Sequence, residues 1–167
     1  MLRGFTQHPG IDFDETFNPV VKPATIHTVL TAALFHDWHV HELGVKNAFL
    51  HGSLDETVYC VQPSGFIDSV HSDFVSCLNK SLYGLKQAPH AWYSRFATCF
   101  LILSFVSARS NTSLFIYQRG AKIVYLLLYV DDIVVTASSV PLLCQVITAL
   151  QQEFPMKDLG PCITFYG

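Results

Sequence analysis

Three segments of the chain carry apolar residues at helical spacing, three or four residues apart. The first covers residues 23–36 and begins with Pro23, a residue suited to the first turn of a helix. The second begins near Pro89, and the third follows Ser139, whose hydroxyl can cap a helix. The apolar positions are Ile26, Val29, Leu30, Ala33 and Leu34, then Trp92, Phe96, Cys99, Phe100 and Leu103, then Leu143, Val146, Ile147 and Leu150. Each segment is therefore predicted to be an amphipathic helix with one face on a core.

Short apolar runs between turn residues predict the strands. They cover residues 40–45, 57–61, 114–118, 122–130 and 133–136, with a last fragment over residues 161–166. Arg119 and Gly120 form the turn of a hairpin, and a turn or short helical segment runs from Lys46 to Gly52. A strand from the first half of the chain is expected to join the hairpins of the second half. The pattern predicts an α+β fold with an antiparallel sheet packed on helices.

Composition favours one domain with a substantial core, because half of the 167 residues are apolar. The mean hydropathy is +0.34, but the most apolar helical segment, residues 96–108, is shorter than the roughly 20 residues that span a bilayer. Residues 1–10 are polar and do not look like a signal peptide. A net charge of −3 argues against a protein that coats nucleic acid in general, but it leaves a local cleft open. We expect an intracellular, cytoplasmic protein that is neither secreted nor membrane-bound.

Cysteine and histidine give no clear metal site. The five cysteines are scattered, odd in number and without a C-x-x-C pair, so we expect reduced thiols rather than disulfides or zinc. His36, His39 and His41 form the densest histidine group. Metal binding there is an alternative, but exposed or hydrogen-bonded histidines are the preferred interpretation.

Two adjacent carboxylates stand in the sequence Y-V-D-D at residues 129–132, between two apolar runs. Strands that present Asp131 and Asp132 at the turn between them make a platform for a hard cation such as Mg²⁺, which prefers carboxylate oxygen. An ordinary hairpin turn is the alternative explanation of the pair on its own.

Further motifs accompany the two aspartates in a fixed order. They are G-F-T-Q at residues 4–7, E-T-F-N-P-V-V-K at 15–22, V-K-N-A-F-L-H-G at 45–52 and S-L-Y-G-L-K-Q-A-P at 81–89. With these segments the chain resembles the reverse transcriptase domain of copia-type retrotransposons, from about residue 3 to residue 167.

The resemblance implies a right-hand polymerase palm with partial fingers, spanning residues 1–167, and RNA-directed DNA synthesis with Mg²⁺ on a primed RNA or DNA template from deoxynucleoside triphosphates. In that family a carboxylate on the first palm strand and the first aspartate of the hairpin hold two ions. Asp131 matches this hairpin ligand and Asp132 its supporting neighbour, so both are the expected catalytic and metal residues. Phe49 matches the aromatic residue that crowds a ribose 2′-hydroxyl. Gln87 matches a contact to nucleotide and template, and Tyr129 is expected at the primer end.

The chain departs from the family pattern at the first carboxylate. The family has L-D-V-K-x-A-F-L, whereas residues 43–50 read L-G-V-K-N-A-F-L, so Gly44 replaces the first metal-binding aspartate. Glu42 points to the same side of the strand but lies about 6.5 Å away along it, too far for a metal–oxygen contact of about 2.1 Å. Loss of this ligand predicts a rate lower by roughly a thousandfold or more.

Smaller departures and alternatives complete the sequence picture. The resemblance favours a basic residue at His90 and a turn glycine at Ser104, and we expect a fragment without thumb, connection or ribonuclease H parts. A non-catalytic remnant that binds nucleic acid or an element protein is the alternative function. Two further alternatives are base stacking rather than core packing by the second helix, and a template path along three cations, Lys80, Lys86 and Arg95.

Overall fold

The computed structural model describes residues 6–161, and the contacts group them into two compact units. One unit holds the residues up to Asn18 together with Ala48–Phe96, and the other holds Pro19–Asn47 together with the residues from Ala97 on. The last division between the units, after Phe96, falls within helix α2 (Ala88–Ile102). Each unit is described below by itself.

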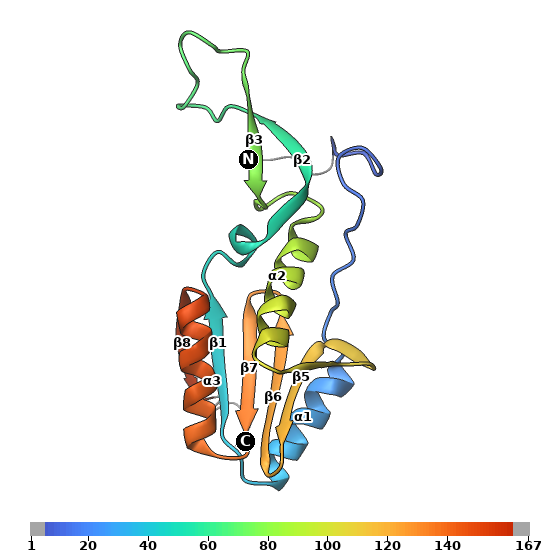
Figure 1. Ribbon diagram of the computed structural model, residues 1–167, viewed down its shortest axis with the longest axis vertical. Helices are drawn as coiled ribbons and strands as arrows, with labels where there is room; N and C mark the ends of the chain where they lie inside the picture. The colour runs from blue at the N-terminus through green and yellow to red at the C-terminus, as the bar shows by residue number, and fades with distance from the viewer. Residues whose placement is uncertain (1–5, 162–167) are drawn as a thin grey trace. The chain divides into compact units, whose positions relative to one another are not determined.

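The second unit is built on a six-stranded antiparallel sheet in the order β4-β5-β6-β7-β1-β8. Its elements are α1 (Pro23–Phe35), β1 (Val40–Val45), β4 (Val106–Ala108), β5 (Asn111–Arg119), β6 (Lys122–Tyr129), β7 (Asp132–Ala137), α3 (Val140–Glu153) and β8 (Met156–Pro161). Figure 1 shows β5, β6, β7 and β1 side by side. Strand β1 comes from the first half of the chain and pairs with β7 of the hairpin that carries the acids, as the sequence predicted. On its other side β1 pairs with β8.

Both faces of this sheet are buried in part, because apolar residues occupy alternate and neighbouring positions of the central strands. On one face Leu114 and Leu127 pack with Val21 and with Val29 of α1. Helix α3 contacts β6 and β7 and buries Leu142, Leu143 and Leu150. The fully buried residues Leu43, Phe115, Val124, Leu126, Ile133 and Val135 lie on the other face of the sheet. This packing fixes the ends of β1, β6 and β7 relative to one another.

The first unit contains the short 3-10 helix η2 (Ala48–His51), the two-stranded antiparallel sheet of β2 (Ser53–Val61) and β3 (Val75–Lys80), and the start of α2 (Ala88–Ile102). A small core of Val58, Leu85 and Ala88 lies beneath them. Gly52 follows η2 at a close approach: a Cβ there would lie 2.8 Å from backbone atoms of Ala91 and Trp92. Glycine is thus required for the chain to pass α2 at this distance.

The predicted α+β class, the three helices and the strands predicted at residues 40–45, 114–118, 122–130 and 133–136 are confirmed; these strands are β1, β5, β6 and β7. Four strands differ from the prediction: β2 begins at Ser53 rather than residue 57, and β3, β4 and β8 were not predicted. Exposed or polar residues dominate β3 and β8, so their alternation carries little apolar signal. The strand predicted at residues 161–166 lies outside the described residues except for Pro161, whereas β8 occupies Met156–Pro161.

Helix ends also differ in detail from the prediction. Ser139 occupies the N-cap position of α3, but no side-chain cap hydrogen bond forms among the described residues. Leu103 lies beyond the end of α2 and is 36% exposed. Ser104 then takes a φ of +67°, a conformation that glycine adopts with less strain.

Candidate functional site

The two aspartates lie at the turn between β6 and β7. Strand β6 ends at Tyr129 and β7 begins at Asp132, and these two residues are register partners. Val130 in the turn has a φ of +56°, which is unusual for a β-branched residue and stores strain of about 1–3 kcal/mol. Asp131 is exposed and Asp132 is half-buried. The hairpin therefore presents both acids at its tip.

Gly44 lies directly beside this tip on the neighbouring strand. It is the register partner of Asp132, and the next residue, Val45, donates its N–H to the Asp131 carbonyl at 2.7 Å. A Cβ on Gly44 would lie 3.8 Å from Asp132 Oδ1 and 3.6 Å from Leu159 Cδ1, both ordinary contact distances. A side chain at position 44 would thus point at the Asp132 carboxylate without displacing its neighbours. The sequence alone did not indicate that Asp132 is the acid that faces position 44.

Negative charge accumulates at this end of the sheet. The pKa of Asp132 is raised above its usual value, mainly by burial and then by the charges of Asp131 and Glu42. Glu42 pairs with Val134, two residues along β1 from Gly44 and on the same face. The Glu42 charge therefore acts at the site even though its place on β1 differs from that of Gly44.

The donor set is incomplete for the divalent ion that the resemblance implies. Mg²⁺ requires near-octahedral oxygen coordination, and a two-ion centre needs carboxylates shared between the ions. Within residues 6–161, no group of three or more His, Cys, Asp or Glu side chains is arranged to hold a metal ion. A raised pKa at Asp132 also weakens it as an ionised ligand. The residues present do not fit a two-ion centre.

Tyr129 shares the face of Asp132, since register partners in an antiparallel pair point to the same side. Its side chain is 54% exposed. Tyr129, Asp132 and Gly44 therefore form one row across β6, β7 and β1. A molecule that contacts the aspartates from this face would also meet the tyrosine ring.

Phe49 and Gln87 belong to the first unit. Phe49 lies in η2, half-buried, with its ring 4.7 Å from that of Tyr83 between centroids. Gln87 is only 2% exposed, and both ends of its amide are engaged within the protein. Its Oε1 accepts from Gln7 Nε2 at 3.0 Å, and its Nε2 donates to the Asp12 carbonyl at 3.0 Å. In this conformation the Gln87 amide holds the chain segment around residues 7–12.

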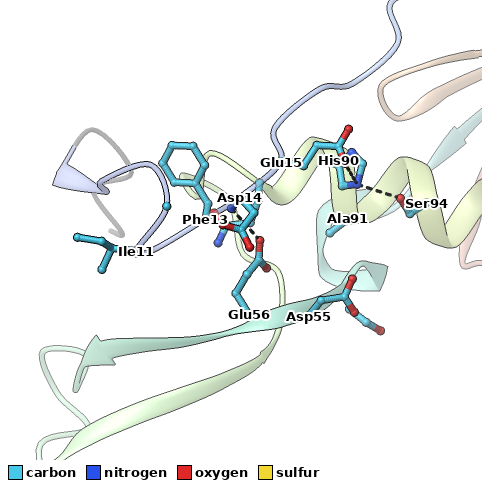
Figure 2. Close-up of a pocket in the computed structure, with 12 residues that line it drawn as sticks. Ile11, Phe13, Asp14, Glu15, Asp55, Glu56, His90, Ala91 and Ser94 are labelled. Atoms are coloured by element: carbon cyan, nitrogen blue, oxygen red, sulfur yellow. Dashed lines mark hydrogen bonds and ion pairs between the residues drawn. The ribbon is translucent and has the colours of Figure 1, made fainter.

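A pocket of about 460 Å³ opens in the first unit, and Gln87 forms part of its wall. Figure 2 shows four carboxylates around it, from Asp14, Glu15, Asp55 and Glu56. His90 also lines the pocket; its Nδ1 donates to the Phe17 carbonyl at 2.8 Å and its Nε2 lies 3.9 Å from a carboxylate oxygen of Glu15. This pocket disfavours anionic ligands by its charge. No motif indicated it, because Asp14 and Glu15 are far from Asp55 and Glu56 in sequence.

The structure also tests the alternatives for the aromatic helix and the histidines, whereas the template path along the three cations stays a prediction. Trp92, Phe96 and Phe100 are at most 1% exposed, so core packing is confirmed and base stacking is wrong. Lys86 Nζ donates to the Gln7 carbonyl at 3.1 Å and lies over the Phe13 ring.

Among the histidines, His41 Nε2 lies 2.6 Å from Asp158 Oδ1, across β1 and β8. This contact lowers the pKa of Asp158, and the backbone N–H of Gly160 adds to the effect. His36 stacks on Trp38. Contacts to other protein groups thus account for two of the three clustered histidines.

Comparison with known proteins identifies the family. The family described as reverse transcriptase (RNA-dependent DNA polymerase) matches residues 1–167. The chain belongs to this family. It is 47% identical over its whole length to the retrovirus-related Pol polyprotein from transposon RE2 of Arabidopsis thaliana, and 41% identical to that from transposon TNT 1-94 of Nicotiana tabacum. These are copia-type elements, as the sequence motifs indicated. The chain spans only 12% and 13% of the two polyproteins.

The family assignment makes Gly44 the most informative residue of this reverse transcriptase chain. The position was found from a single mismatch in a motif, and the structure puts that mismatch opposite Asp132. Ser81, which the motif analysis left without a role, is fully buried and contacts Phe49.

Within residues 6–161, the helices are all too short or too polar to cross a membrane.

Proposed function

We propose that this reverse transcriptase chain forms the palm and part of the fingers of a right-hand polymerase. Its ancestral reaction is RNA-directed transfer of deoxynucleotides to a primer 3′-hydroxyl, with Mg²⁺ as the cofactor. Support comes from the antiparallel sheet that carries Asp131 and Asp132 at a hairpin tip, with position 44 on the adjoining strand. Within residues 6–161, the thiols of Cys60, Cys77, Cys99 and Cys144 form no disulfide, which fits a reducing, intracellular compartment.

We further propose that nucleotidyl transfer by this chain is severely reduced. The observation that carries the proposal is the pairing of Gly44 with Asp132, because a carboxylate at position 44 would complete the acidic group and glycine provides none. Each 1.4 kcal/mol of lost transition-state stabilisation lowers the rate about tenfold, so a missing shared ligand worth several kcal/mol lowers it roughly a thousandfold or more.

The remaining residues keep the roles implied by the family under this proposal. Tyr129 lies in the row of the aspartates and would contact the primer end. Phe49 would exclude a ribose 2′-hydroxyl by crowding it. Gln87 would reach the nucleotide or template only after exchanging its bonds to Gln7 and Asp12, which makes its role depend on movement of that segment.

Primer extension on a primed RNA template tests the proposal. The unmodified chain is compared with Gly44→Asp, which adds the carboxylate, and with Gly44→Asn, which adds a side chain of the same size without charge. We expect extension by the Asp variant alone, at least about a hundredfold above the other two. Robust Mg²⁺-dependent synthesis by the unmodified chain contradicts the loss of activity.

A matched binding measurement separates catalysis from association with nucleic acid. Retention of a primer–template on filters across a salt series reports phosphate contacts, since these give a steep dependence on salt. Binding without extension by the Gly44→Asp variant would favour the non-catalytic alternative.

A further inference from the structure

Two motifs that are separated by some 30 residues meet around the backbone of Phe49. The Phe49 carbonyl accepts hydrogen bonds from the Gly52 N–H at 3.1 Å and from the Ser81 hydroxyl. Ser81 in turn donates its own N–H to the Gly52 carbonyl at 2.9 Å. Ser81 is fully buried, so water cannot replace its hydroxyl in this contact.

The absence of a side chain at Gly52 is what allows the Ser81 hydroxyl to take this position. A Cβ on Gly52 would lie 2.8 Å from Ser81 Oγ and equally close to the α2 backbone. Ser81 and α2 therefore enclose the backbone at Gly52, directly after η2, on the side where a Cβ would lie. These contacts restrict the rotation of the backbone that carries Phe49.

The ring of Phe49 is held separately, by Tyr83 of the same motif. The two ring centroids are 4.7 Å apart with the planes inclined by 48°, within the range of favourable aromatic contacts. The ring also packs on the small core of Val58, Leu85 and Ala88. Phe49 stays half-buried and Tyr83 is 49% exposed, so part of the ring pair remains open to a ligand.

We propose that Ser81 and Tyr83 are positioning residues that fix the Phe49 ring and thereby set the preference for deoxyribose over ribose. The inference rests on the proposed function, since it assigns the Phe49 ring to the sugar of the incoming nucleotide. Discrimination by crowding requires a wall that does not yield, because a ring that can move aside no longer repels a 2′-hydroxyl. Ser81 fixes the backbone of Phe49, and Tyr83 fixes its ring.

The position of the ring is measured first, without any need for activity. The chain carries 4-fluorophenylalanine at position 49, and its ¹⁹F resonance is recorded in four further variants. We expect Ser81→Ala and Tyr83→Ala to shift or narrow the resonance as the ring gains freedom. Tyr83→Phe, which keeps the ring, and Ser76→Ala, a serine substitution in β3, should leave the resonance unchanged. A resonance that moves in neither Ser81→Ala nor Tyr83→Ala overturns the proposal, whatever the polymerase assay gives.

Sugar discrimination is then measured in the Gly44→Asp background. We expect the ratio of kcat/KM for deoxyribonucleotide over ribonucleotide to fall about fivefold in Ser81→Ala and in Tyr83→Ala, the change that one lost hydrogen bond or ring contact produces. Tyr83→Phe should restore the ratio, and a purely structural role would lower both rates equally and leave it unchanged. A moved resonance with an unchanged ratio overturns the link to sugar selection. If Gly44→Asp extends no primer, the proposed function fails, and the fluorine measurement still decides whether Ser81 and Tyr83 position Phe49.

Discussion

The substitution Gly44→Asp should change the stability of the folded protein, and this effect can be measured without catalysis. A Cβ at position 44 fits at 3.6–3.8 Å from its neighbours, so the new side chain causes no steric strain. Its carboxylate, however, points at Asp132, whose pKa is already raised by burial and by two neighbouring negative charges. Without a cation, the variant should therefore be less stable than its uncharged counterpart Gly44→Asn at neutral pH.

The geometry sets the size of this effect. Two carboxylates about 4 Å apart repel each other by about 1 kcal/mol in water and about 4 kcal/mol at the effective dielectric of a protein surface. Asp132 is half-buried, so the penalty lies between these values. For a chain of this size each 1 kcal/mol lowers the melting temperature by about 2–4 °C. We therefore expect Gly44→Asp to melt several degrees below Gly44→Asn in the presence of chelator.

A divalent cation should reverse this order, so that Gly44→Asp melts at a higher temperature than Gly44→Asn. A third carboxylate beside Asp131 and Asp132 completes an oxygen donor set, and a ligand at a hundred times its dissociation constant stabilises the folded state by about 2.7 kcal/mol. Thermal melts in chelator and in millimolar Mg²⁺ or Mn²⁺ measure the difference for the unmodified chain, the Asp variant and the Asn variant. An equal response to the cation in all three would refute the reasoning that position 44 and the aspartates form one site.

Three more predictions follow from single contacts. Asp131→Asn removes a charge that raises the pKa of Asp132, so that pKa should fall in an NMR titration. The stability should increase at neutral pH, and not at a pH well below the ordinary aspartate pKa of about 3.9, where Asp132 is protonated in both the folded and the unfolded state. Asp158→Asn removes a carboxylate whose pKa is lowered by His41, so stability should fall at neutral pH and the loss of stability on acidification through the lowered pKa should shrink, as melts at pH 7 and pH 3 would show. Gly52→Ala forces backbone atoms apart from 2.8 Å and should cost about 1–3 kcal/mol in denaturant unfolding, whereas a neutral result would show that this close approach relaxes freely.

Much of the fold could be predicted from the sequence because its signals are local. The apolar period of α1, the Arg119–Gly120 turn and the apolar runs of β6 and β7 depend on residues close together in the chain. Strands β3, β4 and β8 lack such a signal: β4 has three residues, and β8 is a mostly exposed edge strand. Their existence depends on partners elsewhere in the chain, which a local pattern does not contain.

The sequence by itself determined the family, the pair Asp131 and Asp132, and the missing carboxylate at Gly44, since each is written in contiguous residues. Only the tertiary structure decided that Gly44 faces Asp132 and that Gln87 is enclosed by Gln7 and Asp12. It likewise decided that Ser81 supports Phe49. The physical reason is that strand register and burial arise from pairing between residues far apart in the chain, and packing of the whole unit selects one pairing among many.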